Sequence, residues 1–160
     1  MNELLNKETV KRVERSLREY NANLKVIALK KTARTAKDAS ISLKCELGAI
    51  VKSLVFKAEG EFLVCLVSGD KRCSLNKLKK ILNKKDVAMA NANEVKENTG
   101  FSIGGVAPIG YLKKLNIIVD KSLSRFKFVY GAAGHPDCVF KTTYSDLVQL
   151  ANGKEEEIIE

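Results

Sequence analysis

The sequence has one histidine, His135, and its four cysteines form no C-x-x-C pair. Structural zinc sites need clustered cysteine and histidine ligands, so we expect no such site and reduced, mostly structural thiols. No apolar run approaches the roughly 20 residues of a membrane-spanning helix. The polar N-terminal stretch MNELLNKETVKRVERS lacks the pattern of a secretory signal. These absences predict a cytoplasmic protein without a bound metal or other cofactor.

Acidic residues are outnumbered, because 28 lysines and arginines face 19 aspartates and glutamates and give a net charge of +9. A basic balance favours a polyanionic partner, since each phosphate that a protein neutralises releases counterions. The alternative is a basic protein whose charge serves only solubility. The densest cluster lies on a predicted helix after Ser74, and its candidate contacts with a polyanion are Lys77, Lys80, Lys84 and Lys85.

The chain also lacks internal repeats, and its 160 residues suffice for one domain with a real core, which we expect to span 1–160. Apolar spacing predicts a first amphipathic helix over about 6–20 and another helix over 91–100. Further helices are predicted after the capping residues Thr35, Ser74 and Thr143. Apolar runs predict about seven strands, at 24–30, 49–57, 61–67, 86–90, 115–120, 126–133 and 138–141.

The order of these elements indicates the fold class. Helices and strands alternate irregularly, which is typical of an α+β (mixed α/β) domain. We expect a curled, barrel-like mixed sheet surrounded by helices. The last residues, 153–160, fit either a frayed tail or a short strand.

The stretch GAIVKSLVF, residues 48–56, reads as a buried strand with a lysine at its centre. Successive side chains of a strand point to opposite faces, which puts Lys52 on one face with Ile50, Leu54 and Phe56. Both faces are apolar, so we expect a central strand and a Lys52 that enters a cleft. An ammonium group in such surroundings lowers its pKa or finds a partner. The alternative is a lysine that reaches water along its stem, but the residues flanking it on each side disfavour this.

A glycine-rich loop, TGFSIGGVAPIG, follows the predicted helix 91–100. Its glycines permit positive φ and close backbone approach, and Pro108 stiffens one segment. The loop matches neither G-x-G-x-x-G nor a Walker motif, so nucleotide binding is unsupported. Between the glycines, Ile103 and Val106 would build a small apolar wall with exposed amides. The simpler interpretation is a long turn between a helix and a strand.

A second segment of small residues, GAAGHPDC, covers 131–138. Main-chain N–H groups near Gly134 would be free to meet an anion or a polarised carbonyl. His135 follows at once, although a lone histidine is commonly a turn or surface residue. A nucleophilic Cys138 would need a nearby base, and His135 need not reach it. No Ser-His-Asp or Cys-His set is visible.

Several of these motifs occur together in the order and spacing of the YbaK family. They are RTAKDA, GAIVKSLVF, VSGD, NEVKENTGFSIGGVAPIG, a VD pair and AAGHP…VF…DL, from about Val26 to Leu150. The chain thus resembles the aminoacyl-tRNA deacylases related to the editing domain inserted in bacterial prolyl-tRNA synthetases. The resemblance implies a free-standing editing factor with a barrel-like sheet. Such a factor hydrolyses the ester that joins a wrong amino acid to the 3′ end of tRNA, often tRNA for proline.

The resemblance also implies roles for individual residues. The family's catalytic lysine falls on Lys52 and its late backbone glycine on Gly134, while His135 matches a position that is histidine in some relatives. The candidate substrate-binding residues are Thr35, Gly100, Phe101, Ile103, Gly104, Gly105, Val106 and Pro108, and the lysine cluster after Ser74 supplies the candidate tRNA contacts. The implied partner is misacylated tRNA, with a synthetase or an elongation factor as a further one, and neither DNA nor a membrane is expected.

The implied chemistry agrees with the residues. Ester hydrolysis passes through a tetrahedral oxyanion, and an activated water is the expected nucleophile. Lys52 would supply positive charge to the carbonyl, the ribose or a phosphate, and a neutral Lys52 acting as general base is the less favoured alternative. The loop would wall a pocket for a small side chain such as alanine, cysteine, serine or threonine. Two other functions stay open: a non-catalytic tRNA- or synthetase-binding module of the same fold, and a hydrolase for a small ester.

Overall fold

The structure is a computed structural model that describes residues 3–160. Its α-helices are α1 (Glu8–Tyr20), α2 (Ala36–Leu43), α3 (Leu75–Leu82), α4 (Ala92–Thr99) and α5 (Tyr144–Ala151). Its strands are β1 (Val26–Ala28), β2 (Val51–Ala58), β3 (Glu61–Ser68), β4 (Val87–Met89), β5 (Asn116–Asp120), β6 (Val129–His135), β7 (Cys138–Thr142) and β8 (Lys154–Glu156). Short 3-10 helices span Glu3–Asn6, Leu47–Ala49 and Lys121–Arg125. No helix within 3–160 has the length and apolarity to cross a bilayer.

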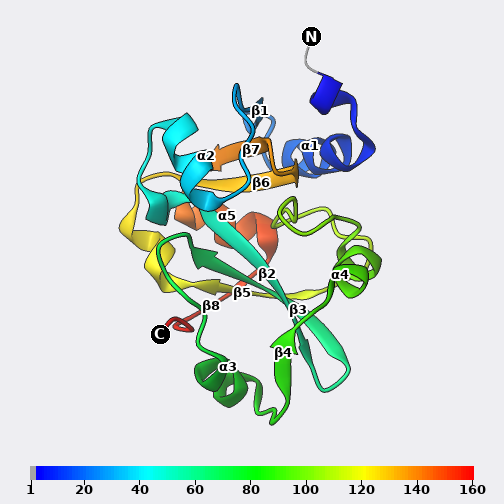
Figure 1. Cartoon of the computed structure of the whole chain (residues 1–160), viewed down its shortest axis with the longest axis vertical. Helices are drawn as coiled ribbons and strands as arrows, with labels where there is room; N and C mark the ends of the chain where they lie inside the picture. Colours follow the sequence, from blue (N-terminus) through cyan, green and yellow to red (C-terminus); the bar gives the residue numbers. More distant parts are fainter. Residues whose placement is uncertain (1–2) are drawn as a thin grey trace.

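The strands form two sheets (Figure 1). One is antiparallel with the order β1-β7-β6, and the other is mixed with the order β4-β2-β3-β5-β8. In the mixed sheet β2 runs antiparallel to β3 and β4, whereas β3–β5 and β5–β8 are parallel pairs. Among the described residues, one parallel bridge, Ile50 to Tyr130, joins the two sheets. The expected α+β class is confirmed, but the strands of 3–160 form two bridged sheets where we expected one curled sheet.

Local sequence sets where the helices begin. Thr35, Ser74 and Thr143 each accept a hydrogen bond from the main-chain N–H three residues on, as predicted for caps. Asn91 and Glu94 form a reciprocal capping box at the start of α4. Residues 153–160 were expected to form either a frayed tail or a short strand. The structure has the short strand, since β8 pairs with β5 and Ile158 is fully buried.

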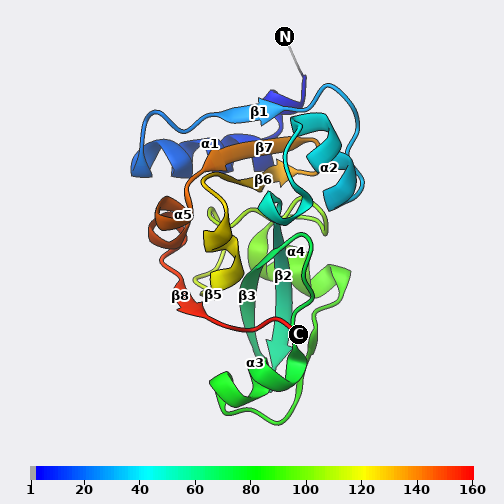
Figure 2. The ribbon, with the colours of Figure 1, turned by 90° about the vertical axis from the view of Figure 1, so that its left-hand side faces the viewer.

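The apolar side chains form a main core between the sheets, a second core under α3 and a smaller cluster in which Ile50 packs with Ala39 of α2. Val51 and Val55 of β2 belong to the main core, together with Val10, Val13 and Leu17 of α1. The opposite face of β2 packs beneath α3, where Phe56, Cys65 and Leu78 lie together. As Figures 1 and 2 show, α1 lies by the three-stranded sheet, and α3 lies at the opposite end of the molecule. The two faces of β2 are therefore both covered, which agrees with a central strand.

Candidate active site

A cavity of about 290 Å³ opens beside β2, where the two sheets meet. Its walls come from the start of α2, from β2, from β4 and α4, from the glycine loop and from β6 and β7. Most of the lining side chains are apolar. Ile103 and Met89 are 61% and 57% exposed, which places them at the mouth. The cavity thus has a largely apolar interior.

The edge of β2 that faces the cavity is only partly paired. β4 pairs with Phe56–Ala58, and Tyr130 bridges to Ile50, so among the described strands none pairs with Lys52–Leu54 on that edge. The N–H of Ala90 donates to the carbonyl of Val55 on this same edge. Because main-chain groups alternate in direction along a strand, those of Ser53, two residues earlier, point the same way. The cavity therefore borders main-chain groups of β2 that a bound molecule can use.

Lys52 lines the cavity and is half-buried. Its ammonium group donates a hydrogen bond to the main-chain carbonyl of Lys71, in the turn after β3. Burial, and after it the positive charge of Arg72, lower the pKa of Lys52, while Asp70 acts in the opposite direction. Lys52 lies on the face of β2 that the pleat predicts. Phe56, on the same face, packs under α3, whereas Val51 and Val55, on the opposite face, pack in the main core. One of three N–H donors is thus satisfied by the main chain.

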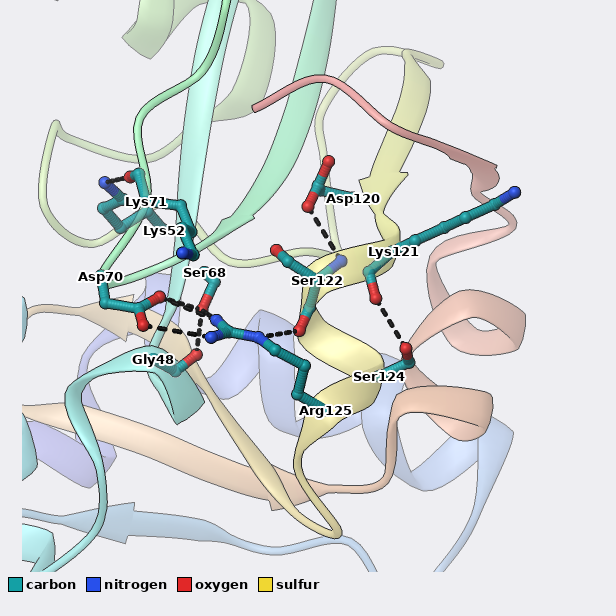
Figure 3. A network of polar contacts seen from close by, with 10 residues as sticks. All are labelled: Gly48, Lys52, Ser68, Asp70, Lys71, Asp120, Lys121, Ser122, Ser124 and Arg125. Carbon is teal, nitrogen blue, oxygen red and sulfur yellow. Dashed lines mark hydrogen bonds and ion pairs between the residues drawn. The ribbon is translucent and has the colours of Figure 1, made fainter. Parts of the chain in front are cut away.

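The turn that holds Lys52 is itself held by an ionic network (Figure 3). Arg125 donates to both carboxylate oxygens of Asp70, at 2.8 and 3.2 Å, and to the hydroxyl of Ser68 at 2.9 Å. Ser68 in turn donates to the carbonyl of Gly48. The Arg125 contacts lower the pKa of Asp70 to about 2. The network fixes the turn before Lys71, and with it the carbonyl that Lys52 contacts.

We expect Asp70→Asn to lower the free energy of unfolding at pH 7. The folded-state pKa of Asp70 lies below its ordinary 3.8, so its ion pair stabilises fully above pH 3.8, and this contribution is lost as the pH falls through about 2. The side chain is 33% exposed, so solvent screening reduces the effect to about 1 kcal/mol. Denaturant titrations of both proteins at several pH values check this. A difference that stays constant down to pH 2 would contradict it.

The glycine loop supplies one wall of the cavity through three of the predicted residues, Ile103, Gly104 and Val106. The other predicted residues of this loop lie behind the wall. Phe101 is fully buried and packs edge-on against Tyr111, and Gly100 ends α4 with φ of +80°. Pro108 lines a second cavity on the β3–β5 side. The structure thus brings part of the loop to Lys52 and uses the rest to support that part.

Gly134 and His135 lie next to the wall but are not lining residues of the cavity. A Cβ on Gly105 would come within 3.1 Å of the main chain of His135, so the two glycine segments pack directly on each other. Gly134 itself faces α1, where a Cβ would lie 2.5 Å from the carbonyl oxygen of Thr9. The Nδ1 atom of His135 accepts the N–H of Asp137 at 3.1 Å, which is a contact within the turn. These contacts tie Gly134 to α1 and His135 to its own turn.

The sequence does not predict some of the residues that line the cavity, and it predicts others only weakly. Thr35, a predicted substrate-binding residue, lines the cavity through its place at the start of α2. Arg34 lies beside Thr35 and is exposed. In the sequence it belongs to a local cluster of basic residues, which gives no further indication of its role. Met89, Tyr130 and other apolar lining residues come from strands whose pattern says only that they are strands.

The predicted lysine cluster lies on and after α3, at the end of the molecule away from α1 (Figure 2). Lys77, Lys80 and Lys85 are exposed, and Lys84 is half-buried. The ammonium group of Lys77 donates to the carbonyl of Ile159 at 2.6 Å. None of the four lines the cavity beside β2.

The fold and this site define a class of protein. A crystal structure of a candidate trans-editing enzyme for prolyl-tRNA synthetase superposes with a TM-score of 0.91 and 35% identity, covering 96% of this chain and 98% of that one. Uncharacterized protein YwhH of Bacillus subtilis (strain 168) is 29% identical over 147 residues, 91% of this chain and 93% of that protein. The proline–tRNA ligase of Thermosipho africanus is 37% identical over 99 residues, 61% of this chain.

Residues 30–150 match the aminoacyl-tRNA editing domain. The chain belongs to the aminoacyl-tRNA editing domain family, which confirms the resemblance seen in the sequence. It spans less than a fifth of the length of the proline–tRNA ligases that it matches.

Proposed function

We propose that this chain hydrolyses the ester between tRNA and a small, wrongly attached amino acid, with tRNA for proline as the expected carrier. The observation that carries the proposal is the position of Lys52, at a small apolar cavity bordered by unpaired main-chain groups of β2. The cavity would hold the amino acid side chain. The edge of β2 and the lysine would meet the polar atoms of the ester.

Lys52 is suited to act through its charge. Its contact with Lys71 uses one N–H, and the other two would meet the carbonyl oxygen, the ribose or the last phosphate. Negative charge grows on the carbonyl oxygen as water attacks, and a fixed cation in a partly dry site stabilises it more than water does. The N–H of Ser53, on the open edge, is a second donor that we assign to this oxygen.

The nucleophile in this proposal is water. Burial, and after it the charge of Asp137, raise the pKa of Cys138 to about 11, so its thiolate is scarce at neutral pH. His135 is engaged within its own turn and is not a lining residue of the cavity. Neither residue therefore fits the role of a covalent catalyst here.

The substrate class proposed here is a small amino acid. The largely apolar cavity of about 290 Å³ would hold the side chain of alanine, cysteine, serine or threonine. Apolar pockets separate single methylenes by only about 1–3 kcal/mol. This small difference is why a separate editing step is useful. Arg34 at the cavity wall would draw the terminal phosphates of the tRNA inward.

We expect the lysines on and after α3 to contribute to tRNA affinity. Replacing Lys80 and Lys85 by glutamine is expected to reduce the slope of log K against log salt by about 1–2, because each lost phosphate contact contributes about 0.7–0.9. Filter binding across a salt series measures the slope. The matched control replaces Lys7 and Lys11, which are also exposed but lie on and next to α1. Equal slopes for the Lys80 and Lys85 variant and the wild type would remove this lysine cluster from the tRNA-binding surface.

A deacylation panel tests the proposal. tRNA for proline is charged in turn with alanine, cysteine, serine, threonine and proline, and amino acid release is followed with the wild-type protein. Release of one of the small amino acids, slowed by added uncharged tRNA, supports the proposal. Tight tRNA binding with no release from any substrate would favour a binding module instead. Release that uncharged tRNA does not slow would favour a hydrolase for small esters.

A further inference from the structure

We propose that Arg12 of α1 positions the glycine loop and thereby sets how large an amino acid the cavity accepts. The selectivity part of this inference rests on the proposed deacylase function. The positioning part rests on the contacts of one guanidinium group with both ends of the loop.

Arg12 joins the two ends of the loop directly. Its Nε donates to the carbonyl of Gly110 at 2.8 Å, and its Nη2 donates to the carbonyl of Gly100 at 3.1 Å and of Thr99 at 3.4 Å. Its guanidinium also lies 4.5 Å from the ring centre of Phe101. Thr99 and Gly100 end α4, where carbonyls have no partner within the helix. This planar side chain therefore joins the two ends of the loop, which the N–H of Leu112 also joins by donating to the carbonyl of Thr99 at 3.3 Å.

The wall of the cavity depends on this closure. Residues 101–115 contain no helix or strand, so their position is set by where the segment starts and ends and by what it packs on. Ile103, Gly104 and Val106, which form the wall, lie between the two ends that Arg12 holds. Gly100 lets the guanidinium approach, because a Cβ there would lie 2.5 Å from its Nη2 atom.

Arg12 can act as a fixed point because α1 is firmly anchored. Val10, Val13 and Leu17 are at most 1% exposed in the main core. The helix lies outside residues 30–150, which match the editing domain. An element beyond the matched region thus supports a wall of the cavity within it.

Loss of the contacts between Arg12 and the loop is expected to change the selectivity among amino acids more than it changes the turnover rate. A loosened loop lets the wall move outward, so a larger side chain such as that of proline is admitted, while Lys52 and β2 keep their places. We expect the ratio of kcat/KM for alanine over proline, both on tRNA for proline, to fall about tenfold in Arg12→Gln. A change of this size lies within the range by which an apolar pocket discriminates one or two methylene groups. The kcat for the alanyl substrate stays within about threefold of wild type.

Two further variants separate positioning from charge. Arg12→Lys keeps the charge but not the planar fork that spans two carbonyls, so we expect it to resemble Arg12→Gln. Arg15→Gln is the matched control, because it removes one charge from the same helix and its described partner is an exposed ion pair with Glu8. It should keep wild-type selectivity.

Amide hydrogen exchange gives a readout that does not depend on catalysis. We expect the amides of 101–112 to exchange at least tenfold faster in Arg12→Gln than in Arg15→Gln, with α5 and β3 unchanged. Wild-type exchange in the loop would overturn the positioning role, and wild-type selectivity in an active Arg12→Gln would overturn the selectivity role. If the wild-type protein releases no amino acid and the loop still exchanges fast in Arg12→Gln, the proposed function is overturned while the positioning role of Arg12 is supported.

Discussion

Replacing Lys52 by alanine is expected to lower the deacylation rate about 100- to 1,000-fold, the usual cost of removing one group that stabilises an oxyanion. Lys52 is half-buried and lines the cavity, and its ammonium group is held by the carbonyl of Lys71. The pKa of Lys52 is lowered, so its charged form is lost at a lower pH than that of an ordinary lysine. Activity that needs this charge should therefore decline as the pH rises, before the pH reaches the ordinary lysine value of 10.5. Single-substrate kinetics over a pH series measures both effects.

The control for this variant comes from the same strand. Lys57 also lies on β2 but is exposed and paired with Glu94 at 3.0 Å, so Lys57→Ala should leave kcat unchanged. Alanine at position 52 also removes a desolvated charge, so the variant should fold at least as well as the wild type by thermal unfolding. A Lys52→Ala protein that hydrolyses every substrate at the wild-type rate would refute the mechanism.

Replacing Gly134 by alanine is expected to destabilise the fold by about 3 kcal/mol, the sum of a strained backbone and an overpacked contact. Gly134 has φ of +88°, and an added Cβ would lie 2.5 Å from the carbonyl oxygen of Thr9 and 3.0 Å from the N of Val10. Both contacts are with the main chain of α1, which cannot rotate out of the way. Denaturant unfolding measures the loss.

Gly60 provides the control for Gly134. Its φ is +87°, almost the same, but nothing lies within 4 Å of an added Cβ. Gly60→Ala should therefore cost only about 1 kcal/mol, the price of the backbone conformation alone. Equal losses at the two positions would show that α1 does not press on Gly134. We accordingly interpret Gly134 as the point where α1 and β6 meet.

The central strand and the helix starts were predictable because their causes are local. The pleat of β2 fixes the face of Lys52 whatever lies around it, and the caps at Thr35, Ser74 and Thr143 act within one turn. The division into two sheets was not predictable in this way. It depends on β7 pairing with both β1 and β6, while the two sheets pack across the main core and Tyr130 bridges to Ile50.

The site was predictable in its residue types but not in its contacts. Lys52 meets the main chain of Lys71, and no side-chain pattern reports a main-chain partner. Asp70 meets Arg125, which lies 55 residues away, and Arg12 meets Gly110 across 98 residues. The open edge of β2 arises because β4 is short and pairs only with Phe56–Ala58. Long-range pairings of this kind depend on the assembled fold.

One measurement tests the central claim most directly: single-turnover release of alanine from tRNA for proline, with wild type and Lys52→Ala at concentrations that bind all of the substrate. Saturation removes any difference in tRNA affinity, so the rates report on chemistry alone. The account predicts fast release by the wild type and release by Lys52→Ala at least about 100-fold slower. Equal rates for the two proteins, or a wild-type rate no faster than buffer, would contradict it.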